Sequence, residues 1–286
     1  MQTGWSVAVP CGCELGERPV WDDAASTLWW VDVHAGRLHR VDAGGAHTIH
    51  ALEPPVGAVG LARDGVVVAA GDVVQVLDSA GRIVRSEIAI GIPAGGRFND
   101  GAVDPAGRFL IGTTESAPGR ADGRLFRVSP AGDVELLLDG VVESNGLGWS
   151  PDGATMYYVD SGEPAVRRYR YDDQTRALSR LHDLVVFAEA DGVPDGLVVD
   201  DSGDVWVAMW DGAAVRRHAA TGDLREVFRT PVSRPTCPVI AAGKVLYLAT
   251  GWEGMSDTAR AAEPWAGHLL RRSVDARPAP TARFAC

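Results

Sequence analysis

The sequence lacks an apolar run close to the about 20 residues that a membrane-spanning helix needs. Its first 13 residues have neither the basic start nor the long apolar stretch of a secretory signal peptide. Basic residues are also few, with 27 Lys and Arg against 38 Asp and Glu, which gives a net charge of −11. Nucleic acids and anionic membrane surfaces both attract basic faces. We therefore expect a soluble, cytoplasmic protein that has neither of these as a partner.

Cysteine is scarce, and its four positions match no zinc-binding spacing and form no dense disulfide framework; they are Cys11, Cys13, Cys237 and Cys286. We interpret them as free thiols in a reducing compartment, the alternative being a metal clip made by the first two. Common catalytic signatures are absent too, since there is no Gly-x-Ser-x-Gly elbow, no phosphate-binding Gly-x-x-x-x-Gly-Lys-Ser/Thr loop and no His-Glu-x-x-His pair. The hydrolase and NTPase classes that these motifs define are therefore excluded.

Glycine and proline are plentiful, with 34 and 17 residues spread along the chain, and they indicate frequent tight turns. Six segments share one pattern, in which two apolar runs flank a short turn, and the clearest copies have a turn of the form Asp/Ser-x-x-Gly. The segments begin at Glu17, Ala58, Asn99, Asn145, Asp195 and Thr236. Two apolar runs around such a turn are typical of a β-hairpin.

The copies recur every 41 to 50 residues, which is the length of a four-stranded propeller blade. A second hairpin follows the first, as in the segment from Leu125 to Leu138. We therefore predict an all-β, six-bladed β-propeller with four antiparallel strands per blade, as one domain over residues 1–286. The segment Trp5-Ser-Val-Ala-Val is expected to pair with the last unit and close the ring, which removes open sheet edges. The structural alternative is a β-sandwich, which lacks so regular a long repeat.

Equivalent positions of successive blades form a ring about the propeller axis. The residues that open the six units, which we call the ring residues, are Glu17, Ala58, Asn99, Asn145, Asp195 and Thr236. Four of them offer carboxylate or amide oxygens, a hard donor set that suits Ca²⁺, Mg²⁺ or Mn²⁺, with Zn²⁺ also possible. Any one of them alone is commonly a turn or strand-start residue that bonds to the backbone. Four in one ring favour a metal site.

The same residues carry a family resemblance. Gly16-Glu-Arg-Pro-Val-Trp, Arg97-Phe-Asn-Asp-Gly, Ser144-Asn-Gly-Leu-Gly-Trp and Pro194-Asp-Gly-Leu resemble motifs of the SMP-30/gluconolactonase/regucalcin-like family. Tyr157-Tyr-Val-Asp-Ser and Ala208-Met-Trp-Asp-Gly extend the match. The resemblance implies a six-bladed propeller that binds one divalent cation, with Ca²⁺ the first expectation. It also implies a lactonase that acts on a small sugar lactone.

By position, the resemblance makes Glu17, Asn145 and Asp195 the metal ligands. It makes Asp195 also the general base, which takes a proton from the attacking water. The cation is expected to polarise the lactone carbonyl or to lower the pKa of a bound water.

The resemblance also implies substrate contacts. Arg97 and Asn99 match the family's substrate-contacting pair, and Glu115 matches an acidic substrate contact only loosely. Arg offers five fixed donors to an oxygen-rich ligand. The structural alternative for Arg97 is an ion pair with Asp100, Glu17 or Glu115.

The sequence departs from the family pattern in the last blade. His268 stands where the family usually has a small residue, and we interpret it as a local packing change rather than a catalytic residue. Among the tryptophans, Trp149 and Trp210 follow ring or strand-end positions and are candidates for the wall of a pocket.

Three other functions fit parts of this pattern. A non-catalytic Ca²⁺-binding regulatory propeller would use the same ring, and a metal-dependent esterase or organophosphate hydrolase would need a more apolar pocket. A protein-interaction propeller of the WD kind fits the fold alone. The polar ring and the absence of a Gly-His…Trp-Asp signature count against it.

Overall fold

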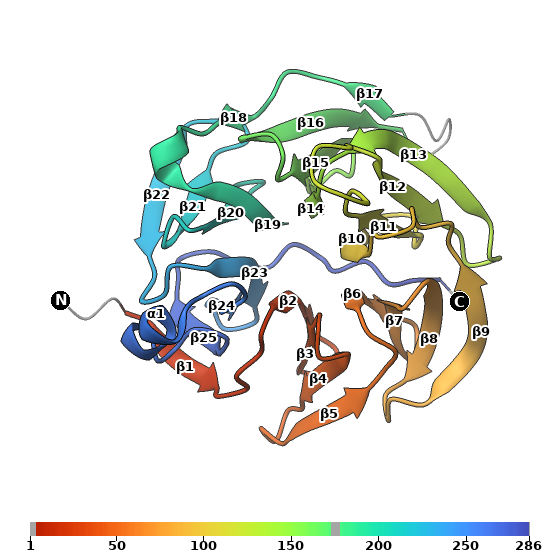
Figure 1. The fold of residues 1–286 in the computed structure, drawn as a ribbon, viewed down its shortest axis with the longest axis horizontal. Helices are drawn as coiled ribbons and strands as arrows, with labels where there is room; N and C mark the ends of the chain where they lie inside the picture. The colour runs from red at the N-terminus through yellow and green to blue at the C-terminus, as the bar shows by residue number, and fades with distance from the viewer. Residues whose placement is uncertain (1–3, 173–177, 286) are drawn as a thin grey trace.

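The chain folds into six antiparallel sheets arranged around a central axis, in a computed structural model that describes residues 4–172 and 178–285 (Figure 1). The predicted all-β, six-bladed propeller is confirmed. Blade 1 comprises β2 (Gly16–Asp22), β3 (Thr27–Asp32), β4 (Arg37–Val41) and β5 (His47–Ala51), and blade 2 comprises β6 (Val56–Ala62), β7 (Gly65–Ala70), β8 (Val73–Asp78) and β9 (Ile83–Ala89). Blade 3 comprises β10 (Phe98–Val103), β11 (Phe109–Thr113), β12 (Gly123–Val128) and β13 (Val134–Val141).

The remaining blades follow the same order outward from the axis. Blade 4 comprises β14 (Ser144–Trp149), β15 (Thr155–Asp160), β16 (Ala165–Tyr171) and β17 (Leu178–Arg180), with β18 (Val185–Val186) also paired to β16. Blade 5 comprises β19 (Val193–Val199), β20 (Val205–Trp210), β21 (Ala214–His218) and β22 (Leu224–Arg229). Blade 6 comprises β23 (Pro235–Ala241), β24 (Val245–Thr250), β25 (Leu269–Ser273) and β1 (Ser6–Val9).

Helix is confined, within the described residues, to the 3₁₀ turn η1 (Glu189–Asp191) and the short α1 (Asp257–Ala262) between β24 and β25. No helix in this part of the chain has the length and apolar character needed to cross a membrane.

The predicted hairpin turns form as their residue types require. Between β10 and β11, the carbonyl of Asp104 accepts from the backbone N–H of Gly107 at 2.9 Å. The Asp104 carboxylate also accepts from the backbone N–H groups of Ala106 and Arg108, at 3.0 and 2.8 Å. Gly107 has a φ of 78°, a left-handed conformation that glycine adopts without steric cost. In the corresponding hairpins of blades 4 and 5, the N–H of a glycine likewise donates to the backbone carbonyl three residues earlier.

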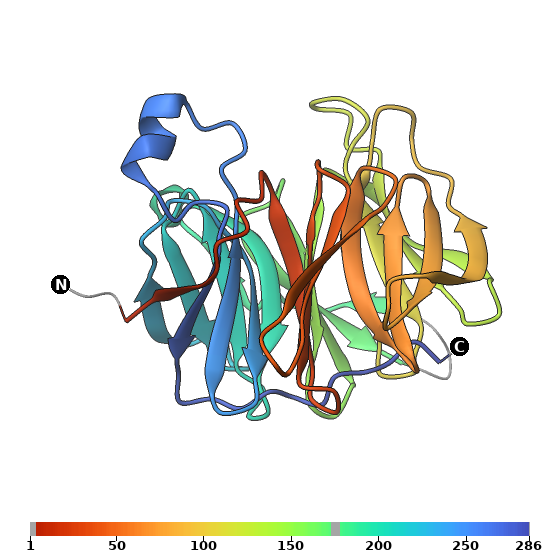
Figure 2. The ribbon, with the colours of Figure 1, turned by 90° about the horizontal axis from the view of Figure 1, so that it is seen from below.

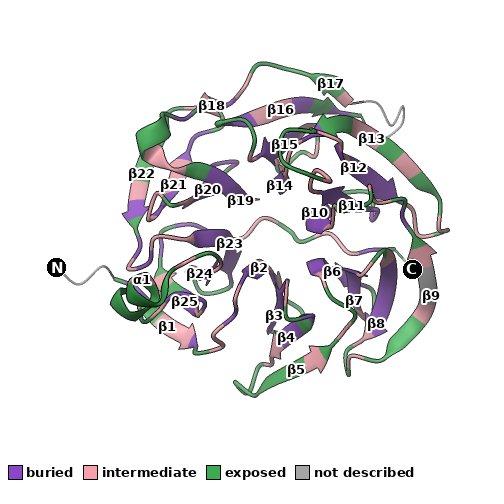
Figure 3. Ribbon diagram, viewed as in Figure 1, coloured by how far each residue is buried: buried purple, intermediate pink, exposed green. Residues whose placement is uncertain are grey.

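The hydrophobic core is divided into wedges between neighbouring blades. Six clusters of buried apolar side chains occur in the described residues, and each draws its members mainly from two adjacent blades. The inner strands are buried while the outermost strands are largely exposed (Figure 3). Because each wedge requires both of its blades, the ring must close to complete the core.

The N-terminal strand closes the ring, as predicted. β1 pairs antiparallel with β25 through Ser6↔Arg271 and Val7↔Leu270. Trp5 packs between blades 5 and 6 and donates its indole N–H to the carbonyl of Arg229 at 2.8 Å. The last blade is therefore made from both ends of the chain.

The C-terminal segment crosses one face of the propeller, opposite the face that carries α1 (Figure 2). Its Phe284 is fully buried against blades 2 and 3, and the Phe284 N–H donates to the carbonyl of Leu61 at 2.7 Å. Farther back in the segment, the carbonyl of Arg277 accepts from the N–H of Asp201 at 3.1 Å. Leu61 and Asp201 lie where inner strands β6 and β19 end. The segment thus covers the end of the inner strands that is farther from the ring residues.

Candidate functional site

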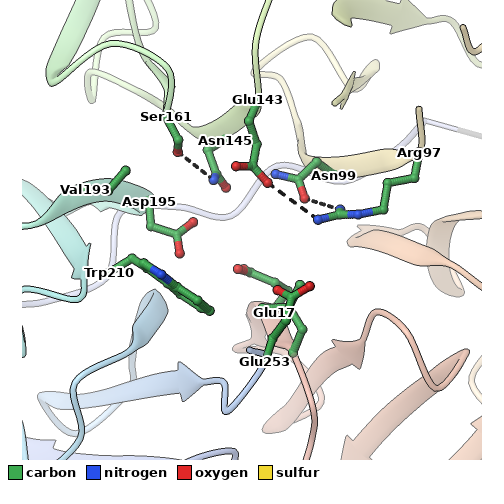
Figure 4. Close-up of a pocket in the computed structure, with 11 residues that line it drawn as sticks. Glu17, Arg97, Asn99, Glu143, Asn145, Ser161, Val193, Asp195, Trp210 and Glu253 are labelled. Carbon is green, nitrogen blue, oxygen red and sulfur yellow. Dashed lines mark hydrogen bonds and ion pairs between the residues drawn. The ribbon is translucent and has the colours of Figure 1, made fainter. Parts of the chain in front are cut away.

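The ring residues all lie at the start of the innermost strand of their blade, in β2, β6, β10, β14, β19 and β23. In every blade the pairing of this strand with its neighbour gains one residue at or next to the ring position. Such a bulge bends the strand and redirects the side chain. The four ring residues with carboxylate or amide groups are consequently turned towards one another, although each remains only 5–6 % exposed. Figure 4 shows Glu17, Asn145 and Asp195 facing the same space.

This space is a cavity of about 190 Å³, which we call the ring pocket. Its lining combines ring residues with residues from the loops on the same face. The lining residues are Leu15, Glu17, Arg97, Asn99, Glu143, Asn145, Ser161, Val193, Asp195, Trp210 and Glu253. All four oxygen-bearing ring residues therefore share one cavity.

Two buried oxygens in the ring pocket have no hydrogen-bond partner among the described residues, namely Asn145 Oδ1 and Asp195 Oδ1. Hydrogen bonds through Ser161 fix the orientation of the Asn145 amide. Its Nδ2 donates to Ser161 Oγ at 2.9 Å, and the Ser161 hydroxyl donates onward to the carbonyl of Pro194 at 2.8 Å. An unpartnered buried acceptor is costly, so a cation or a hydrogen-bond donor in the ring pocket would satisfy both atoms.

The two carboxylates among the ring residues, Glu17 and Asp195, both have raised pKa values. Burial raises the pKa of Asp195 well above its usual range, and the nearby carboxylates of Glu17 and Glu143 raise it further. Burial also raises the pKa of Glu17, with added repulsion from Asp100. The N–H of Arg18, which donates to Glu17 Oε2 at 3.0 Å, opposes this shift only in part. A divalent cation between the carboxylates would remove the repulsion. Oxygen donors of this kind are those that Ca²⁺, Mg²⁺ and Mn²⁺ prefer.

Arg97 borders the ring pocket without facing its carboxylate pair. Its Nη1 donates to the carbonyl of Phe98 at 3.0 Å and to Asn99 Oδ1, and its Nη2 lies 3.5 Å from Glu143 Oε1. Asn99 in turn donates its Nδ2 to the carbonyl of Ser144 at 2.9 Å. Both ends of the Asn99 amide therefore have a partner, whereas only the Nδ2 end of the Asn145 amide has one. The ion-pair partner of Arg97 is Glu143, a residue outside the three alternatives that the sequence suggested.

A buried ion pair lies one residue further along the inner strands. Arg18 Nη1 lies 3.4 Å from Asp100 Oδ2 and 3.4 Å from the carbonyl of Leu147, so the guanidinium of blade 1 reaches blades 3 and 4. The Asp100 side chain is 1 % exposed, and its Oδ1 accepts from the N–H of Gly101 at 2.7 Å. This pair forms a polar layer next to the ring residues, inside the propeller.

Some candidate residues lie outside the ring pocket. The carboxylate of Glu115 accepts from the N–H groups of Gly119 and Ala121, at 2.9 and 2.8 Å, and so holds its own loop together. Trp149 packs edge-on against Tyr171, with 5.7 Å between ring centroids, while Trp210 does line the cavity.

His268 also lies away from the ring pocket. Its Nδ1 accepts from the N–H of Gly12 at 3.2 Å. This contact joins the last blade to the segment that closes the ring, which agrees with a packing role.

Several lining residues were not identified from the sequence. Glu143 stands two residues before Asn145, as Arg97 stands two residues before Asn99, so the repeat itself contained the signal. Glu253 follows the last inner hairpin and pairs with His34 at 2.7 Å. Its loop has no counterpart of equal length in the other blades, so the repeat could not place it.

Comparison with known proteins supports the family resemblance seen in the sequence. A family model described as the SMP-30/Gluconolactonase/LRE-like region matches residues 15–251. The chain is 36 % identical to pentonolactonase XacC of Haloferax volcanii over 285 residues, which cover 96 % of each protein. It is 34 % identical to a 6-deoxy-6-sulfogluconolactonase of Pseudomonas putida over 272 residues, which cover 91 % of each.

Solved structures give a similar result. A calcium-binding protein, regucalcin, from Agrobacterium tumefaciens superposes with a TM-score of 0.88 at 27 % identity, covering 98 % of this chain and 97 % of that one. A luciferin-regenerating enzyme superposes with a TM-score of 0.89 at 24 % identity, covering 99 % of each chain, and this likeness concerns the fold alone.

Proposed function

The chain belongs to the SMP-30/gluconolactonase/LRE-like family, and we propose that it is a divalent-metal-dependent hydrolase that opens a sugar lactone in the ring pocket. The pocket would lie at the mouth of the central channel, on the face that the C-terminal segment leaves open. The observation that carries the proposal is the pair of unpartnered buried oxygens, Asn145 Oδ1 and Asp195 Oδ1, beside the carboxylate of Glu17.

We propose Glu17, Asn145 and Asp195 as the residues that hold the cation. Their donors are all oxygen atoms, and two of the three residues carry charges whose repulsion a cation relieves. Ca²⁺ is the first candidate, with Mg²⁺, Mn²⁺ and Zn²⁺ as alternatives. When bound, the cation supplies Lewis-acid charge for the lactone carbonyl and lowers the pKa of the attacking water.

Asp195 is the residue we propose as general base. It accepts a proton from water as the water oxygen bonds to the carbonyl carbon. The ring C–O bond then breaks, and the proton passes to the departing alkoxide oxygen. The product is an open hydroxy acid, whose ionisation at neutral pH releases one proton per turnover. The buried position of Asp195 keeps bulk water away from this transfer.

Arg97 and Asn99 are proposed to bind the hydroxyl groups of the substrate. Asn99 and Glu143 hold the guanidinium at the edge of the cavity, and its side chain remains 21 % exposed. Two relatives are named as lactonases of sugar acids, a pentonolactone and a sulfogluconolactone. The polar lining of the ring pocket suits a ligand of this polyhydroxylated class. Glu115 is left out of the proposed substrate contacts because its carboxylate is bound within its own loop.

The proposal is tested with the purified protein and a panel of lactones, followed by proton release. Pentono- and hexonolactones should be opened much faster than a lactone without hydroxyls, an aryl ester or an organophosphate. Faster turnover of the ester or organophosphate would assign a different hydrolase activity to the same scaffold. Cation binding without turnover of any substrate would favour the regulatory alternative.

Arg97→Ala is expected to raise KM for a sugar lactone by about 10- to 100-fold, because hydrogen bonds to charged groups are worth about 1.5–3 kcal/mol. The affinity for the cation should change little, since Arg97 contacts none of the three proposed ligands. A lactone without hydroxyls serves as the control and should be affected much less. Equal losses on both substrates would show that Arg97 supports the pocket rather than binding substrate.

Ser161→Ala is expected to weaken cation binding by about 10- to 100-fold, the usual effect of losing a residue that orients a metal ligand. The variant removes the acceptor of Asn145 Nδ2 and leaves the amide free to turn. Ser150→Ala is the matched control, because its hydroxyl bonds Asp152 and Thr155 in the turn after β14. Isothermal titration of both variants with Ca²⁺ measures the effect, and equal affinities would remove Ser161 from the site.

A further inference from the structure

A group of side chains that could hold a metal ion lies outside the ring pocket, at the seam between the last blade and the first. After β1 the chain crosses from blade 6 to blade 1, and Cys11 and Cys13 lie in this crossing. Asp32 is at the end of β3, and His39 is in β4. Cys13, Asp32 and His39 are buried, and their donor atoms lie within 4.8 Å of one another. We call these four residues the seam cluster.

The ring of His39 is held so that one nitrogen faces the thiol. Its Nε2 lies 3.8 Å from Cys13 Sγ, and its Nδ1 lies 3.0 Å from His47 Nε2. Trp30 stacks on both imidazoles, with 4.8 and 5.3 Å between ring centroids. In the tautomer that donates Nδ1–H to His47, the lone pair of His39 Nε2 faces Cys13. Histidines that bind metals are commonly oriented in this way.

Cys11 lies beside the other three residues of the seam cluster. Its Sγ donates to the carbonyl of Gly267 at 3.3 Å, and its side chain packs against the buried cluster that contains Cys13. Cys11 is only half-buried, so a cation or a small reagent can reach the cluster from solvent.

We propose that Cys13, Asp32 and His39, joined by the neighbouring thiol of Cys11, form a site for a thiophilic divalent cation of the Zn²⁺ class. Cys sulfur, His nitrogen and Asp oxygen are all Zn²⁺ ligands, whereas the all-oxygen donors of the ring pocket suit harder ions. Tetrahedral Zn–S and Zn–N bonds place their two donor atoms about 3.6 Å apart, close to the 3.8 Å between Cys13 and His39.

The position of the seam cluster indicates that a bound cation would link two parts of the propeller. Cys11 and Cys13 belong to the segment that closes the ring, while Asp32 and His39 belong to blade 1. A shared cation therefore fastens the closing segment to the first blade, and it stabilises the folded state that alone presents all four donors. None of the four residues lines the ring pocket, so this site is independent of the proposed hydrolysis.

Cobalt is the probe for this site, because thiolate ligands give Co²⁺ an intense near-ultraviolet charge-transfer band that oxygen ligands do not. Reduced protein, stripped with a chelator, is titrated with Co²⁺. We expect the band to saturate at one equivalent, to disappear when Zn²⁺ is added, and to be accompanied by a rise in the thermal unfolding midpoint. Absence of the band in the reduced wild-type protein would overturn the proposal.

Variants assign the band to residues. Cys13→Ser and His39→Gln should each lose it or weaken Co²⁺ binding at least tenfold, while Cys237→Ser, which removes a buried thiol elsewhere, should retain it. Asp195→Asn should also retain it, which separates the seam cluster from the ring pocket. If Cys13→Ser fails to fold, Cys11→Ser at the half-buried position serves in its place. A band that survives Cys11→Ser and His39→Gln unchanged would contradict the assignment.

Discussion

Asp195→Asn is expected to lower kcat for lactone hydrolysis by about 10²- to 10⁴-fold, the usual effect of losing a general base. The amide that replaces the carboxylate keeps an oxygen in the same place, so cation binding should weaken without being abolished. Steady-state proton release at saturating cation gives the rate, and direct titration gives the affinity. Near-normal turnover with weakened binding would restrict Asp195 to the role of a ligand.

Glu253→Gln is the matched control for this variant. It removes a carboxylate from the same pocket, but one that pairs with His34 and contacts none of the proposed ligands. Its kcat should stay within about tenfold of the wild type, because it removes no catalytic proton acceptor. Equal losses in the two variants would attribute the effect to the total charge of the pocket rather than to Asp195.

Arg18→Met is expected to lower the free energy of unfolding by about 3–5 kcal/mol, since it leaves the buried Asp100 carboxylate without its cation. Arg18 has a φ of 42°, and methionine meets the same backbone strain there, so the comparison concerns the charge. Urea unfolding measures the loss. The double variant Arg18→Met/Asp100→Asn should recover most of it, because it leaves no buried charge unpaired.

The loss in Arg18→Met should also depend on pH. Burial already raises the pKa of Asp100 in the wild-type fold, and the coulombic attraction of Arg18 opposes that shift. Without Arg18 the folded-state pKa of Asp100 rises further, so the loss grows as pH rises from the folded-state pKa of the wild type to that of the variant, and it disappears in acid that protonates Asp100 in both proteins. A loss that does not vary with pH, or no recovery in the double variant, would show that Arg18 acts through packing alone.

The sequence predicted the blades and the ring because both depend on repetition. Equivalent turns and apolar runs identify the strands, and equivalence about an axis brings Glu17 and Asp195 together although 178 residues separate them. The family resemblance identified Arg97 and Asn99 as a pair. Glu143 could have been predicted from the repeat, by its position two residues before Asn145.

Other features required the three-dimensional structure. The bulge at each ring position inserts a residue into the strand, so simple alternation does not show where Arg18 points. Glu115 depends on the path of its loop, which folds Gly119 and Ala121 onto the carboxylate. The seam cluster joins Cys13 to His39 across the ring closure, and no repeat relates these two residues.

The rate of sugar-lactone opening before chelation, after chelation and after return of a single cation tests the central claim most directly. Proton release by one protein preparation supplies all three values. We expect chelation to remove the activity, and Ca²⁺, Mg²⁺, Mn²⁺ or Zn²⁺ to restore it in the wild type but not in Asp195→Asn. Undiminished hydrolysis in the chelated wild-type protein would contradict a metal-dependent lactonase.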